Sequence, residues 1–137
     1  MPEIGGILET ALYVDDMDRA VDFYGRVLGL SSIFRNDRLT AFDAGSGGVL
    51  LIFRRGASVE DMPGPSGIIP GHDGRGPLHM AFKIPAAELQ AWRTHLAASG
   101  VPIRSEVTWH AGGTSLYFHD PDGHVIELAT PGLWPNY

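Results

Sequence analysis

The chain repeats one pattern of hydrophobic and polar positions twice. A run rich in strand-forming residues, Leu8 to Val14, precedes Asp15 and Asp16, and aspartate is favoured at the start of a helix. Gly29 is placed to end that helix, and apolar residues recur before it at helical spacing, at Met17, Ala20, Val21, Tyr24, Val27 and Leu28. The pattern predicts a strand followed by an amphipathic helix.

The second copy begins 70 residues later, where Leu78 takes the place of Leu8. Its strand is expected over Leu78 to Ile84, after which Pro85 opens a helix and Gly100 ends it. The apolar positions of this helix are Leu89, Trp92 and Leu96. The same order of strand, helix and glycine therefore occurs twice.

Each copy also contains a hairpin pattern in its second half. The segments Phe42 to Leu51 and Phe118 to Glu127 align 76 residues apart, and both read as strand, glycine turn, strand. One further strand is expected between helix and hairpin, at about 31–35 and 103–107. Each half is thus predicted to be a βαβββ module, which makes the chain an α+β protein.

We expect one domain built from these two modules. Module one covers about 6–55, a linker about 56–76, module two about 77–130, and a C-terminal tail 131–137. The linker is dense in glycine and proline, so we interpret it as a surface connector or as a lid over a site.

The composition and charge of the chain limit the classes of function and of metal ligand that it can have. The chain has 137 residues, no cysteine, 10 basic and 16 acidic side chains, and a formal charge of −6. The chain has no run of lysine or arginine that would indicate nucleic-acid binding, and no apolar run that is long enough to span a membrane. We therefore expect a cytoplasmic protein, whose metal site, if it has one, uses His, Asp or Glu.

Three potential metal ligands share one face of the predicted sheet. Because alternate strand residues face opposite sides, Glu9 and His79 occupy equivalent positions away from the helices, and Glu127 on the closing strand joins them. Two carboxylates close together repel each other unless they are protonated or hold a cation. Taken singly, each residue has a simpler interpretation as a solvated glutamate or a hydrogen-bonded structural histidine.

Strand alternation also places Tyr117 on this face, together with Tyr13 and Ser115. His110, beside Trp109, is a candidate loop acid or base. Packing for the tyrosines and a surface position for His110 are the simpler interpretations. His119 and His124 flank the second hairpin turn, where we expect them to be exposed.

Three segments resemble one known group of proteins. VDDMDRAVDFYGRVLGL, GPLHMAFKI and SLYFHDPDGHVIEL are similar to the glyoxalase/bleomycin-resistance/extradiol dioxygenase group, the vicinal oxygen chelate superfamily. The resemblance covers nearly the whole chain. It implies that paired βαβββ modules form a curved, open barrel-like mixed sheet with the helices outside, and that the protein is a homodimer. Whether the modules pair within one chain or across a dimer is open.

The resemblance also implies a ligand set. Glu9, His79 and Glu127 fall on the family's three metal positions, while Leu51, which cannot coordinate, falls on the fourth position of glyoxalase-I-like members. One divalent ion, Mn, Fe, Co, Ni or Zn, suits two carboxylates and an imidazole. Glu9 departs from the His-His-Glu set of the extradiol dioxygenases and the fosfomycin-modifying members.

The expected function is that of a glyoxalase-like, metal-dependent lyase or isomerase that acts on a small molecule with adjacent oxygens. Glu127 is the leading catalytic candidate, followed by His110 and Tyr117. The alternatives are an extradiol-type dioxygenase, a metal-free drug-binding protein of the bleomycin-resistance type, and a scaffold whose site is vestigial.

Overall fold

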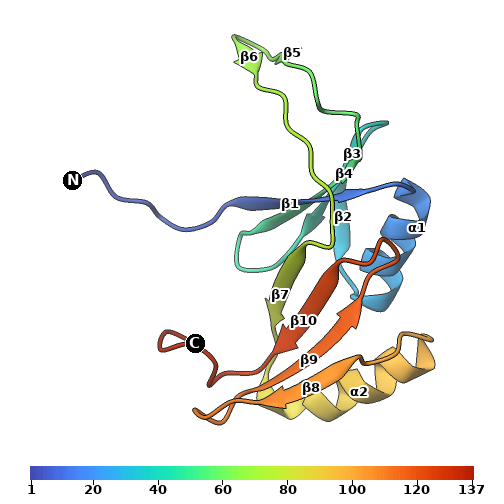
Figure 1. Ribbon diagram of the computed structural model, residues 1–137. Helices are drawn as coiled ribbons and strands as arrows, with labels where there is room; N and C mark the ends of the chain where they lie inside the picture. Colours follow the sequence, from blue (N-terminus) through green and yellow to red (C-terminus); the bar gives the residue numbers. More distant parts are fainter. The chain divides into compact units, whose positions relative to one another are not determined.

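The computed structural model describes residues 1–137 and divides into two compact units, Met1–Arg75 and Gly76–Tyr137. Each unit contains a four-stranded sheet and helical segments, as Figure 1 shows. No helix in the chain has the length and apolar character needed to cross a membrane.

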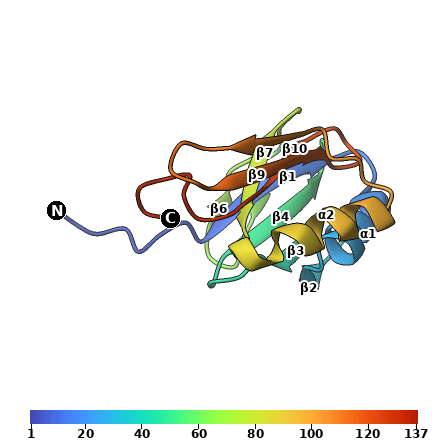
Figure 2. The ribbon, with the colours of Figure 1, turned by 90° about the horizontal axis from the view of Figure 1, so that it is seen from below.

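Unit 1 is the first βαβββ module. Its elements are β1 (Glu9–Val14), α1 (Met17–Asp22), the π-helical segment η1 (Phe23–Val27), β2 (Ser31–Arg35), β3 (Leu39–Asp43) and β4 (Val49–Arg54). The sheet order is β1-β4-β3-β2, with β1 parallel to β4 and the other pairs antiparallel. Residues 1–8 run away from the start of β1 (Figure 2).

The first helix begins and ends as its sequence predicts. Asp16 caps it, because its carboxylate accepts a hydrogen bond of 3.0 Å from the Arg19 N–H. Gly29, with φ of 71°, follows the helical segment in the left-handed conformation that glycine tolerates. The helix covers one face of the sheet, where Tyr24 packs against Phe42 at a ring distance of 6.1 Å.

The predicted linker belongs to unit 1 and forms an arm with a short hairpin, β5 (Met62–Pro63) and β6 (Ile68–Ile69). In Figure 1 this arm extends away from the four-stranded sheet. Its base is joined by backbone hydrogen bonds, including one of 2.7 Å from the His72 N–H to the Ser58 carbonyl. The sequence pattern does not predict this hairpin, because its strands have only two residues each and lie in a segment rich in glycine and proline.

Unit 2 is the second βαβββ module. Its elements are β7 (His79–Lys83), the 3-10 turn η2 (Ala86–Glu88), α2 (Leu89–Ala98), β8 (Ser105–Thr108), β9 (Thr114–His119) and β10 (Val125–Ala129). The sheet order β7-β10-β9-β8 repeats that of unit 1, with β7 parallel to β10. The α+β class and the duplicated module are therefore confirmed.

Each sheet has one face toward its helix and one face away from it. In unit 2, Arg93 of α2 forms an ion pair with Glu106 of β8, which marks the helix side. We call the opposite face of each sheet the site face. Side chains on it come from alternate residues, and the strand register decides which of them are neighbours.

Candidate functional site

The strand register confirms the alignment of the two modules. Glu9 pairs with Val49 in the parallel ladder of unit 1, and His79 pairs with Val125 in the matching ladder of unit 2. The next site-face pairs are Ala11 with Leu51 in unit 1 and Ala81 with Glu127 in unit 2. Leu51 and Glu127 are therefore structural equivalents, as the 76-residue offset predicts.

His79 and Glu127 lie side by side within unit 2. The imidazole Nε2 is 3.3 Å from Glu127 Oε2, and the Glu127 residue is only 4% exposed while the His79 side chain is 53% exposed. His79 Nδ1 lies 2.9 Å from the Val125 carbonyl, which can only accept, so Nδ1 carries a proton. In the neutral imidazole, this leaves the Nε2 lone pair on the side of Glu127.

A hydrogen-bond relay holds the other oxygen of Glu127. The hydroxyl of Ser115, a fully buried residue, donates to Glu127 Oε1, and the same Ser115 oxygen accepts a hydrogen bond of 2.8 Å from Trp109 Nε1. An indole N–H can only donate, so it directs the serine proton toward the carboxylate. The relay fixes the orientation of Glu127 from the side opposite to His79.

Tyr117 completes the surroundings of Glu127. The two residues are direct cross-strand partners, and the Tyr117 ring centre lies 6.3 Å from that of His79. Burial, followed by the negative charge of Glu127, raises the pKa of the Tyr117 hydroxyl. Tyr117 is therefore a neutral phenol, able to donate a proton in a hydrogen bond, at ordinary pH.

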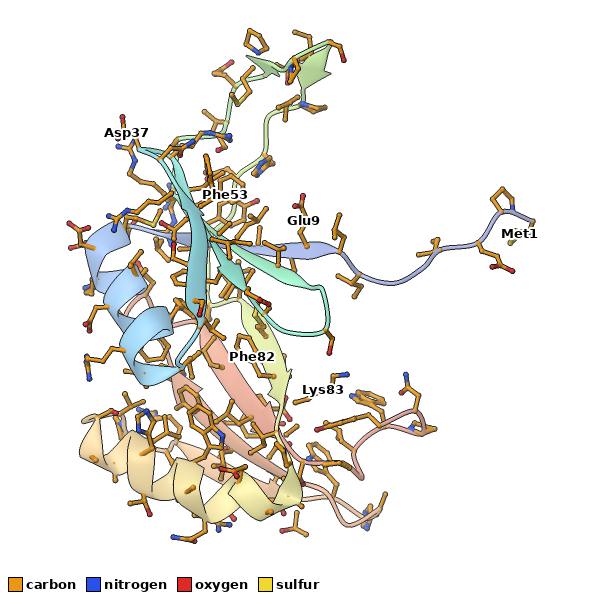
Figure 3. The ribbon with its side chains drawn as sticks, turned by 180° about the vertical axis from the view of Figure 1, so that it is seen from behind. Met1, Glu9, Asp37, Phe53, Phe82 and Lys83 are labelled. Atoms are coloured by element: carbon orange, nitrogen blue, oxygen red, sulfur yellow. The ribbon has the colours of Figure 1, made fainter.

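Glu9 belongs to unit 1, at the exposed start of β1, where Figure 3 shows it next to the extended N-terminal segment. The structure brings together His79 and Glu127 within unit 2, whereas Glu9 belongs to unit 1. No group of three or more His, Asp or Glu side chains is placed to hold a metal ion. The three-ligand set therefore stays a prediction.

Apart from the exposed Asp43, which pairs with Val49, the sheet rows beyond Glu9 on the unit 1 site face are apolar. Leu39, Ala41 and Phe53 form a buried cluster, against which four half-buried residues pack: Ala11, Tyr13, Val49 and Leu51. Figure 3 shows Phe53 on the sheet, away from Glu9. This face carries hydrophobic surface where unit 2 carries polar groups.

The base of the arm is attached to this apolar face by Tyr13 and His72. A hydrogen bond of 2.8 Å joins the Tyr13 hydroxyl to His72 Nδ1, and the His72 ring lies edge-on to Phe53 at 4.6 Å. Burial, and secondarily the charge of Asp73, raises the pKa of Tyr13. No local pattern indicates this contact in the sequence, because Tyr13 and His72 are 59 residues apart.

Three other histidines of the chain differ in exposure. His110 lies exposed in the turn between β8 and β9 and has no contact with His79 or Glu127. His119 is exposed, as expected, but the expectation that His124 is exposed is wrong. His124 is fully buried, and its Nδ1 accepts a hydrogen bond of 3.0 Å from the Leu78 N–H, so it joins the hairpin turn to the start of β7.

Comparison with known proteins places this chain in a family. The family model described as the glyoxalase/bleomycin resistance protein/dioxygenase superfamily matches residues 6–128. The chain belongs to this superfamily. The resemblance found in the sequence motifs is therefore confirmed.

Relatives within the superfamily are named as different enzymes. Metallothiol transferase FosB of Shouchella clausii is 27% identical over 134 residues, covering 95% of this chain and 83% of the relative. Catechol-2,3-dioxygenase of Bacillus subtilis is 29% identical over 118 residues, covering 85% of this chain but 38% of the relative. A crystal structure of lactoylglutathione lyase from Agrobacterium tumefaciens superposes with a TM-score of 0.88 at 32% identity, covering 98% of this chain and 99% of that one.

Proposed function

We propose that this superfamily member is a metal-dependent enzyme that binds a small molecule through adjacent oxygen atoms, as a glyoxalase-like lyase or isomerase does. The observation that supports it most is the pairing of His79 with the buried carboxylate of Glu127. The names of the relatives include a transferase, a dioxygenase and a lyase, so they support an enzyme without selecting the reaction.

The surroundings of Glu127 suit a cation. The carboxylate is buried, yet the basic group within ion-pairing distance is the imidazole of His79, and no lysine or arginine pairs with it. A buried carboxylate without a compensating charge is destabilising, and a divalent ion removes that cost. Nε2 of His79, with Nδ1 already bound to Val125, is the nitrogen available for coordination.

Glu9 is the proposed third ligand. It occupies the position in unit 1 that His79 occupies in unit 2, and its exposed carboxylate forms no ion pair or hydrogen bond that would compete with a metal. Two carboxylates and one imidazole suit Mn, Fe, Co, Ni or Zn. Three protein ligands would leave coordination positions for the oxygens of a substrate.

The residues have distinct parts in this proposal. A bound divalent cation would supply Lewis-acid stabilisation of negative charge that develops on a substrate oxygen. Glu127, held by Ser115, keeps a fixed direction, and Tyr117 offers a phenolic proton beside it. A substrate seated against Tyr117 would thus meet a hydrogen-bond donor and a carboxylate on one face.

Metal content tests the proposal. The protein is treated with chelator, reloaded separately with Mn, Fe(II), Co, Ni and Zn, and analysed by mass spectrometry beside His79→Ala and Glu127→Ala. We expect about one equivalent in the wild type and none in either variant, since each removes a ligand. Glu106→Ala, which removes an exposed carboxylate of the same unit, should retain the metal.

Two results would overturn the assignment. Full metal retention in both ligand variants, with circular dichroism showing an intact fold, would mean that the metal binds elsewhere. No specific binding of any of the five metals would favour a metal-free small-molecule binding protein instead. The site face of unit 1 fits that second candidate, because its half-buried residues Tyr13, Val49 and Leu51 present hydrophobic surface.

The family resemblance also favours a homodimer, which light scattering on the purified protein would test. A mass of twice 14.8 kDa is the expected result, and a monomer at all concentrations would contradict it.

A further inference from the structure

An open pocket lies on unit 2 beside the His79–Glu127 pair. It has a volume of about 390 Å³ and is lined by Arg104, Ser105, Tyr117, Phe118, His119 and Val125. Strand register places four of the lining residues on the site face, because Ser105 is opposite Tyr117 and Val125 is opposite His119. Arg104 directly precedes β8, and Phe118 belongs to the other face of β9.

The same register connects the pocket to the candidate metal ligands. Tyr117 is the cross-strand partner of Glu127, and Val125 is the partner of His79. The pocket and the pair thus share two adjacent rows of the sheet. A small molecule that contacts one is within reach of the other.

The lining has the chemistry of an anion site. Arg104 has a permanent positive charge and a planar set of N–H donors, His119 adds a ring N–H, and Ser105 adds a hydroxyl. None of the six lining residues is acidic, in a chain whose formal charge is −6.

Arg104 also differs from four of the other eight arginines of the chain. Arg26, Arg35, Arg55 and Arg93 each form an ion pair with a carboxylate, whereas Arg104 pairs with none. An unpaired guanidinium on a pocket is well suited to bind a carboxylate or phosphoryl group through two parallel hydrogen bonds.

We propose that Arg104 and His119, with the hydroxyl of Ser105, bind an anionic group of the substrate, a carboxylate or a phosphate-like oxyanion. The metal-chelating oxygens of that substrate would lie toward Glu127, and this second statement rests on the proposed function. The substrate class is then a small oxygenated anion, held at one end by the pocket and at the other by the metal site.

Anion titration of the metal-free protein tests the pocket alone. In chelator-treated, ¹⁵N-labelled protein, inorganic phosphate and acetate are titrated separately at constant ionic strength while amide NMR signals are recorded. We expect saturable shifts at Arg104, Ser105 and His119 with at least one anion. Saturation by phosphate alone indicates a phosphoryl-type substrate, and saturation by acetate alone indicates a carboxylate.

Matched variants separate a built site from general electrostatics. Arg104→Gln should weaken the binding at least about tenfold, because it removes a charge-assisted hydrogen bond. His119→Ala should weaken it less. Arg93→Gln removes the same charge from an arginine already paired with Glu106 and should leave the titration unchanged.

The proposal is overturned if neither anion gives saturable shifts at these residues, or if Arg93→Gln weakens binding as much as Arg104→Gln. Either failure leaves metal binding by Glu127 untouched. Conversely, Glu127→Ala should leave the phosphate or acetate titration saturable if the pocket acts as proposed, so the two proposals fail separately.

Discussion

The two modules share one backbone plan but present opposite chemistry on the same face. At one matched position of the sheet, unit 1 has Leu51 and unit 2 has Glu127. Leu51 packs against the apolar cluster around Phe53, whereas Glu127 is bound by Ser115 and lies beside His79. A duplicated fold can therefore specialise one copy for packing and the other for polar chemistry.

The modules also differ at the row of the sheet that contains Tyr13 in unit 1 and Lys83 in unit 2, where unit 1 is again the more apolar. Unit 1 pairs Tyr13 with Phe53, whose rings stack at 5.8 Å, while unit 2 pairs Lys83 with Ala129. The aromatic pair in unit 1 has the base of the arm attached over it through His72. Hydrophobic contact thus stabilises this face of unit 1, and hydrogen bonds organise that of unit 2.

Placing a carboxylate at position 51, where unit 2 has Glu127, should have the largest effect on stability. Leu51→Glu places a carboxylate against an apolar cluster without the partners that Glu127 has, and we expect a loss of about 2–4 kcal/mol in the free energy of unfolding. Urea denaturation in chelator measures it. Leu51→Met, which keeps the packing, should cost less than about 1.5 kcal/mol. Equal stability of the two variants would contradict the difference between the faces.

Breaking the relay in unit 2 should affect metal affinity more than stability. Ser115→Ala frees one oxygen of Glu127, and we expect the affinity for Mn to fall about 10–100-fold, as is typical when a partner of a ligand is removed. Trp109 loses its acceptor at the same time, so its fluorescence should shift. Ser99→Ala, at the end of α2, is the control. An unchanged Mn affinity in Ser115→Ala would separate the relay from metal binding.

The contact between Tyr13 and His72 should contribute a smaller amount, and only to stability. Tyr13→Phe keeps the ring stacking but removes the hydrogen bond, so the free energy of unfolding should fall by about 0.5–1.5 kcal/mol. A double-mutant cycle with His72→Ala isolates the coupling. Zero coupling would show that the hydrogen bond does not hold the arm, and a change in metal affinity would show that the two faces are not independent.

The smallest expected effect is a shift in a titration. Because burial and then the charge of Glu127 raise the pKa of Tyr117, Glu127→Gln in chelated protein should lower that pKa only part of the way to its ordinary value. NMR titration of ¹³C-labelled tyrosine, with Tyr117→Phe for assignment, measures it. The pKa of Tyr13, raised by burial and Asp73, should not move. An unchanged Tyr117 pKa would remove Glu127 as a cause.

The raised pKa of Tyr117 also determines how the free energy of unfolding changes at high pH. Above about pH 10 an unfolded tyrosine loses its proton while Tyr117 in the fold retains it. The free energy of unfolding contributed by Tyr117 is therefore complete below that pH and falls as the pH rises through the folded pKa. The fall should be smaller in Glu127→Gln.

The periodic parts of the sequence predicted the fold. Strand alternation and the repeat offsets place Glu9 and His79 at matched positions, and the register confirms it. Local signals of this kind are strong because capping aspartates, helix-ending glycines and alternating apolar residues act over a few residues. The same alternation also indicated that Ser115 and Tyr117 share the face of Glu127.

Contacts between distant segments could not be predicted in the same way. Nothing near His124 in the sequence indicates that it is buried. Its imidazole accepts a hydrogen bond from the backbone N–H of Leu78, which lies 46 residues away. The hydrogen bond between Tyr13 and His72 likewise joins residues 59 positions apart, and no local pattern in the arm indicates it. Such contacts depend on tertiary packing rather than on local pattern.

Pulsed electron paramagnetic resonance of the Mn-loaded protein tests the central claim most directly, because it detects nitrogen bound to the metal. We predict coupling to one imidazole nitrogen, that of His79, which disappears in His79→Gln, together with about one Mn per chain. Coupling to two or more imidazoles, or one that persists in His79→Gln, would contradict a site made of one histidine and two glutamates.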